Sequence, residues 1–177
     1  MRETWRKWKE LKRRRRWVGW VQEGVLALLL LGLVFAWQTR KLVSSGELAP
    51  AFELRDLEGK VWRSEDLLGK PTVLHFWAPW CGVCAQDAGT FASLARSKGS
   101  EVNVVSVALA FEGREEVERF VRKNGVDYPV LLGNDALMQA FKVDSFPTTY
   151  FLSGEGRIRR AAVGYTTGLG LRLRLVL

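Results

Sequence analysis

Two cysteines, Cys81 and Cys84, are the residues of this sequence best suited to covalent chemistry. They are the only cysteines among 177 residues, and two residues separate them. The pair follows an apolar run, 72–77, and precedes a segment with helical spacing, so we expect it between a strand and the start of a helix. The free backbone N–H groups at a helix N-terminus stabilise a thiolate, which is the attacking form of cysteine. This arrangement indicates a redox pair.

The cysteine pair alone leaves two other roles open, a structural one and a metal-binding one. A structural zinc ion needs about four ligands, and His75 is the only histidine in the chain. We therefore expect no zinc site. Two thiolates can also hold copper(I), so a copper-binding thiol module stays an alternative to disulfide exchange.

Strand and helix patterns alternate around the cysteines. Strands are expected over 72–77, 101–108, 128–132, 149–152 and 158–163, and helices over 85–98, 114–124 and 135–141. A hairpin with its turn at Glu58-Gly59 precedes them, and a short helical turn covers 64–68. The pattern predicts an α/β fold in which helices cover both faces of a mixed central sheet.

Three stretches of the sequence resemble known proteins. The run FWAPWCGVC, 76–84, resembles the FWAxWCxxC signature of the thioredoxin superfamily. The segment 49–60, with the pattern A-P-x-F-x-L-x-D-L-x-G-K, is similar to the N-terminal hairpin of the TlpA-like branch, the membrane-tethered thioredoxins that face the periplasm. The tail, 164–177, is similar to that of ScsD-type members, which are associated with copper tolerance. The resemblance implies a thioredoxin-like fold over 50–177 that closes with a helix, although leucines alternate in the tail as in a strand.

The thioredoxin resemblance also implies roles for residues at the site. Cys81 would attack a substrate disulfide, and Cys84 would resolve the mixed disulfide. Pro147 matches a proline that is cis in the superfamily and lies beside the cysteines, where it would hold the substrate backbone. Phe146 would shape that contact, and Trp80 is expected to pack around the site.

Two ionisable residues, His75 and Asp87, are candidates for moving a proton to or from Cys84. Asp87 matches an acidic residue, usually Glu, in the TlpA-like pattern C-x-x-C-x-x-E-x-P, but Gly89 stands in place of the proline. A carboxylate stabilised by the first turn of a helix is an equally good interpretation of Asp87. His75 lies six residues before Cys81, where cytosolic thioredoxins have a buried Asp. Imidazole titrates near neutrality, so His75 could act as a relay, or it could simply pair with the backbone.

The N-terminal residues predict a membrane anchor. Residues 1–16 hold nine Lys/Arg against two Glu, whereas the remainder has 18 basic and 17 acidic residues. The net charge of +8 thus comes from the tail, and a nucleic-acid binder would be expected to carry its basic residues on the folded domain. Residues 17–37 could span about 31 Å as a helix, with Trp at both ends. Gln22 and Glu23 shorten the uninterrupted apolar run, so a cleaved signal peptide stays an alternative.

The charge asymmetry predicts the orientation and the compartment of the chain. By the positive-inside rule, residues 1–16 lie in the cytoplasm, 17–37 cross the membrane, 38–49 form a linker, and 50–177 face the periplasm. Disulfides form and persist in that compartment. We therefore expect a membrane-anchored thiol–disulfide oxidoreductase without a cofactor, with protein thiols or disulfides as substrates. Its redox partner would be a membrane electron transporter or a quinone-linked oxidase. A reductant for cytochrome c maturation is a narrower alternative.

Overall fold

The computed structural model describes residues 20–33 and 44–176. The chain divides into two compact units, Met1–Arg40 and Lys41–Leu177. In the first unit, residues 20–33 are helical and their side chains are exposed. Within the described ranges, no helix is both long and apolar enough to cross a membrane. The predicted anchor, 17–37, extends beyond the described part of the first unit at both ends.

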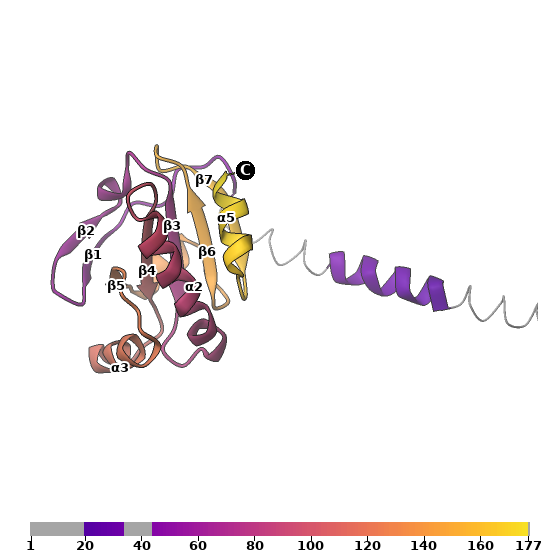
Figure 1. The fold of residues 1–177 in the computed structure, drawn as a ribbon, viewed down its shortest axis with the longest axis horizontal. Helices are drawn as coiled ribbons and strands as arrows, with labels where there is room; N and C mark the ends of the chain where they lie inside the picture. The colour runs from indigo at the N-terminus through magenta and orange to yellow at the C-terminus, as the bar shows by residue number, and fades with distance from the viewer. Residues whose placement is uncertain (1–19, 34–43, 177) are drawn as a thin grey trace, which may run out of the picture. The chain divides into compact units, whose positions relative to one another are not determined.

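The second unit is built on one mixed sheet of seven strands (Figure 1). The spatial order of the strands is β2-β1-β5-β4-β3-β6-β7. Strand β3 runs parallel to β4, which runs parallel to β5, and the other neighbours are antiparallel. The bounds are β1 Glu53–Asp56, β2 Val61–Arg63, β3 Thr72–Trp77, β4 Asn103–Ala108, β5 Val130–Leu132, β6 Thr148–Leu152 and β7 Ile158–Val163. The predicted α/β class with a mixed sheet and an N-terminal hairpin is confirmed.

Capping residues mark the ends of several helices in the second unit. They are η1 Ser64–Leu67, α2 Gly82–Lys98, α3 Arg114–Asn124, α4 Asp135–Ala140 and α5 Gly168–Val176. Asn134 caps α4 by accepting a hydrogen bond from the backbone N–H of Leu137. Gly125 ends α3 in the left-handed conformation, with φ of 62°. The closing helix that the resemblance implied is present, and α2 begins three residues earlier than the helical spacing predicted.

Strand β3 lies in the interior of the sheet, between β4 and β6, and both of its faces are covered. Leu74 and Phe76 belong to a core that also holds Phe141, at the end of α4. On the opposite face, Val73 shares a core with Phe91 of α2 and Leu171 of α5. Helices α2 and α5 lie side by side on that face (Figure 1). A strand that is apolar on both faces fits this buried position, as its sequence predicted.

The chain enters the second unit along the free edge of β7. The backbone N–H of Gly46 donates to the carbonyl of Ile158 (2.7 Å), and the N–H of Ile158 donates to the carbonyl of Glu47 (2.9 Å). The N–H of Ala49 donates to Gly156 (2.9 Å). These bonds pair the end of the predicted linker with the last strand of the sheet. The N-terminal end of the domain is therefore held against the β7 edge.

Candidate active site

The cysteine pair occupies the N-terminus of α2, as its sequence context predicted. Cys81 is the N-cap residue of the helix, and its Sγ accepts a hydrogen bond from the backbone N–H of Cys84 at 3.2 Å. The two sulfurs form a disulfide. Cys81 is 7% exposed and Cys84 is 1% exposed, so an incoming group reaches Cys81 first. In the reduced form, the same N–H group and the helix dipole would stabilise a thiolate on Cys81.

Aromatic side chains border the cysteines on the surface. Trp80 is 64% exposed, and its indole Nε1–H donates to the carbonyl of Ala110 at 2.9 Å. The rings of Trp80 and Phe146 pack edge to face, with their centroids 5.6 Å apart. Phe146 also packs against the apolar cluster that contains both cysteines. The indole hydrogen bond ties the cysteine loop to the loop after β4. Trp80 and Phe146 therefore form an apolar wall beside the disulfide.

Pro147 is buried and lies at the end of β3 that leads to the cysteines. The peptide bond between Phe146 and Pro147 is cis, as the resemblance implied. The next residue, Thr148, is paired with Phe76 of β3, and its hydroxyl donates to the carbonyl of Ser145 at 2.8 Å. The part of Pro147 in holding a substrate backbone stays a prediction.

Asp87 is fully buried on the inner face of α2, three residues after Cys84. Its Oδ1 accepts a hydrogen bond from the backbone N–H of Thr166 at 3.2 Å, whereas Oδ2 has no partner among the described residues. Burial raises the pKa of Asp87 to about 6, and the Thr166 hydrogen bond offsets part of this effect. A carboxyl group with such a pKa can take up or release a proton near neutral pH. Residues three apart on a helix share a face, so Asp87 lies toward the same side as Cys84.

His75 is also buried, and its described contacts are with Phe91 of α2 and Thr149 of β6. Its ring stacks on that of Phe91, with the centroids 4.0 Å apart, and its Nδ1 is 3.1 Å from the hydroxyl of Thr149. Burial lowers the pKa of His75 to about 3, so the imidazole is neutral throughout the physiological range. The proton-relay roles predicted for His75 and Asp87 both stay predictions.

Three residues of the site were not identified from the sequence. Thr166 holds Asp87 through a backbone N–H, and Ala110 binds Trp80 through a backbone carbonyl. Backbone groups leave no signature in the residue type. Thr149 bonds to His75 across the antiparallel pair β3–β6, in which the two residues are directly opposed. This contact could have been found from the strand register.

The arrangement can perform thiol–disulfide exchange. It combines a disulfide at a helix N-terminus, an apolar wall for a peptide, and a buried carboxyl group with a raised pKa. Among residues 20–33 and 44–176, no three His, Cys, Asp or Glu side chains lie close enough together to hold a metal ion.

Comparison with known proteins identifies the relatives of this chain. A protein-family model described as the AhpC/TSA family matches residues 45–161. The thiol-disulfide oxidoreductase ResA of Bacillus subtilis (strain 168) is 32% identical over 168 residues, which cover 89% of this chain and 90% of that protein. The structure of MTB dsbF in its mixed oxidized and reduced forms superposes with a TM-score of 0.65 at 31% identity, over 71% of this chain and 92% of that one. A thiol:disulfide interchange protein from Chlorobium tepidum TLS shares the fold, with a TM-score of 0.68 at 22% identity over 76% of this chain and 97% of that one.

Proposed function

Because the chain belongs to the AhpC/TSA family and is a protein-disulfide oxidoreductase of the ResA type, we propose that it acts from a membrane anchor on exported proteins. The observation that carries the exchange chemistry is the disulfide between Cys81 and Cys84 at the N-terminus of α2. The anchor is inferred from the basic residues 1–16 and the largely apolar run 17–37. Its substrates are protein thiols and disulfides, and the reaction needs no cofactor.

In the reducing direction, the reaction begins at Cys81. Its thiolate attacks one sulfur of a substrate disulfide, forms a mixed disulfide, and releases the other substrate sulfur as a thiolate. Cys84 then attacks Sγ of Cys81, which restores the disulfide of the enzyme and frees the second substrate thiol. The reverse sequence oxidises a substrate dithiol. Pro147 and the Trp80–Phe146 wall hold the substrate chain beside Cys81.

The attack by Cys84 requires that its thiol lose a proton. Cys84 is buried, and an apolar environment disfavours the charged thiolate. Asp87 accepts this proton, because its carboxyl group is buried on the same helix face and has a pKa of about 6. The proton returns when the disulfide is reduced again.

The proposal also assigns a membrane anchor and a cellular compartment to the protein. Residues 17–37 form the anchor, 1–16 stay in the cytoplasm, and the catalytic domain lies in the periplasm or its extracytoplasmic equivalent. The match to ResA covers 89% of this chain and therefore reaches into the N-terminal 49 residues, which supports a shared extension. A membrane electron transporter or a quinone-linked oxidase would recharge the pair. Fusion of alkaline phosphatase to the C-terminus tests the orientation, since the reporter is active only outside the cytoplasm.

Two narrower functions fit the same pair of cysteines. A reductant for the CxxCH cysteines of apocytochrome c would use the same site and layout, and a copper-tolerance role follows from the ScsD-like tail. A copper module would need the two thiols but not Pro147 or the aromatic wall. The exchange function therefore accounts for more of the site.

Insulin reduction in the presence of dithiothreitol tests the proposed exchange. We expect the wild-type chain to accelerate insulin precipitation and the Cys81→Ser variant to have no activity. Retention of copper(I) by the wild-type chain without turnover would instead support the copper module. Titration of the disulfide against glutathione gives its reduction potential and so shows the direction of the reaction. A potential of about −270 mV indicates a reductant, and one of about −120 mV indicates an oxidant.

A further inference from the structure

Exposed apolar side chains of the second unit gather at the cysteines, at Leu48 and Leu68, and at the C-terminus. Trp80 and Val83 flank the cysteines, where they belong to the site already described. A separate group lies at the C-terminus: Leu169 and Leu173 of α5 are 70% and 51% exposed, and Tyr165, just before α5, is 54% exposed. The exchange reaction uses none of these three.

The exposed leucines form the outer face of α5. Leu169 and Leu173 are four residues apart and therefore lie one above the other on the helix. Leu171 points the opposite way and is fully buried in the core shared with Phe91. At 100° per residue, Arg172 and Arg174 fall on either side of the leucine stripe. An apolar stripe bordered by basic residues is typical of helices that lie in a membrane interface.

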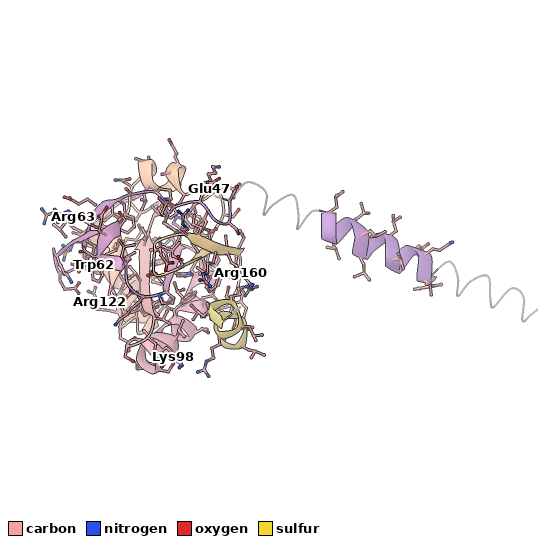
Figure 2. All side chains as sticks on the ribbon, turned by 90° about the horizontal axis from the view of Figure 1, so that it is seen from above. Glu47, Trp62, Arg63, Lys98, Arg122 and Arg160 are labelled. Carbon is pink, nitrogen blue, oxygen red and sulfur yellow. A yellow bond between two sulfur atoms is a disulfide. The ribbon has the colours of Figure 1, made fainter. Side chains whose placement is uncertain are left out.

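A third arginine adds to the positive charge beside α5. Arg160 of β7 is paired with Phe151, which belongs to the core under α2 and α5, so its side chain lies on the α5 side of the sheet. Figure 2 shows Arg160 on that side of the domain. Among the described residues, no ion pair involves Arg160, Arg172 or Arg174. Their charge is therefore free to meet an anionic surface.

The segment that precedes the first strand runs beside this surface. Residues 44–49 are hydrogen-bonded along β7, the strand that carries Arg160. Between the end of the proposed anchor at 37 and this paired segment there are six residues, which span at most about 20 Å. The proposed anchor and this short tether would keep the domain close to the bilayer.

We propose that α5 and Arg160 form a docking surface for an anionic phospholipid bilayer. Leu169 and Leu173 enter the interface between headgroups and acyl chains, and the three arginines bind lipid phosphates. This inference rests on the proposed membrane anchor. A second point of attachment fixes the orientation of the catalytic domain above the membrane, whereas a tether alone leaves it free to rotate.

Hydrogen exchange of the full-length protein in lipid nanodiscs tests the docking. The protein is placed, one copy per disc, in phosphatidylcholine alone or in a mixture with phosphatidylglycerol. We expect the backbone amides of 165–176 to exchange at least about fivefold more slowly in the anionic discs, because each arginine near such a surface strengthens binding about fivefold. The double variant Arg172→Gln/Arg174→Gln should remove this difference. The matched control, Arg119→Gln/Arg122→Gln on α3, should keep it.

Three results would overturn the docking surface. Equal exchange of α5 in both kinds of disc means that the bilayer does not cover it. Slower exchange that appears only with two copies per disc, whatever the lipid charge, identifies the face as a contact between copies. Loss of the effect in the α3 control means that net charge alone is responsible. A chain that does not insert into discs at all refutes the proposed anchor instead, so the two failures are distinguishable.

Discussion

Replacement of Asp87 by Asn should change how the stability of the catalytic domain depends on pH. In the folded protein the pKa of Asp87 is about 6, against an ordinary value of 3.8, because the carboxyl group is buried. The folded state therefore binds the proton more tightly than the unfolded state. As a result, the free energy of unfolding falls as the pH rises from about 4 to about 6. At about 1.4 kcal/mol per pH unit, ionised Asp87 lowers the stability by about 3 kcal/mol at neutral pH.

His75 has the opposite pH dependence, so the wild-type profile alone does not isolate Asp87. Burial lowers the pKa of His75 from 6.5 to about 3, and the protein therefore loses stability as the pH falls below about 6.5. The difference between the Asp87→Asn variant and the wild type cancels this contribution. We expect that difference, variant minus wild type, to increase by about 2.5 kcal/mol between pH 4 and pH 8.

Urea denaturation of the oxidised unit, residues 41–177, measures this difference at a series of pH values. Asp56→Asn is a control for which the stability difference should change with pH in the opposite direction. Burial favours the neutral form of Asp56, but hydrogen bonds from Trp62, Lys60 and Glu58 outweigh it and lower the pKa of the carboxyl group. The stability that ionised Asp56 supplies is present above its ordinary pKa and lost at lower pH. A stability difference for Asp87→Asn that does not vary with pH would refute the reasoning, because it would mean an ordinary pKa at position 87.

Three further substitutions give distinct outcomes. Trp80→Phe removes the indole hydrogen bond to Ala110 at an exposed position, so insulin reduction should fall about tenfold while the unfolding free energy changes by about 1 kcal/mol; unchanged activity would show that the bond has no part in the reaction. His75→Asn should leave the pH profile of the exchange rate unchanged between pH 5 and pH 8, because the imidazole is already neutral there; a lost limb of the profile would establish the relay. Phe120→Ala removes a ring stacked on Trp77 at 4.1 Å and should lower the unfolding free energy by about 3 to 5 kcal/mol in urea titrations; a loss below about 1 kcal/mol would mean that the cluster repacks.

The sequence predicted those parts of the fold that depend on periodicity. Strand β3 has apolar side chains on both faces and is buried at every position, and α3 ends at Gly125 as expected. The start of α2 was placed too late, because its first turn is capped by the sulfur of Cys81 rather than marked by an apolar pattern. The sequence of the tail was ambiguous, because its leucines alternate as in a strand. In the structure the tail forms the short helix α5, which includes Gly168 and Gly170 and buries Leu171.

The cysteine site could be predicted because its residue types carry the chemistry. The environment of Asp87 could not, since its raised pKa depends on burial and on a backbone N–H from Thr166, 79 residues away. In the same way, the sequence indicated a histidine that titrates near neutrality, but burial against Phe91 removes that property from His75. The charge state of a buried group is set by its tertiary contacts, which periodicity does not reveal.

Capture of a mixed disulfide tests most directly whether Cys81 is the attacking residue and Cys84 the resolving one. The reduced full-length Cys84→Ser variant is mixed with oxidised insulin, and the products are separated without reductant and mapped by mass spectrometry. We expect a stable adduct joined through Cys81 and released by dithiothreitol, because the thiol that would resolve it is missing. Reduced Cys81→Ser should form no adduct, since Cys84 is buried. An adduct of equal yield through Cys84, or none in either variant, would contradict the proposed exchange mechanism.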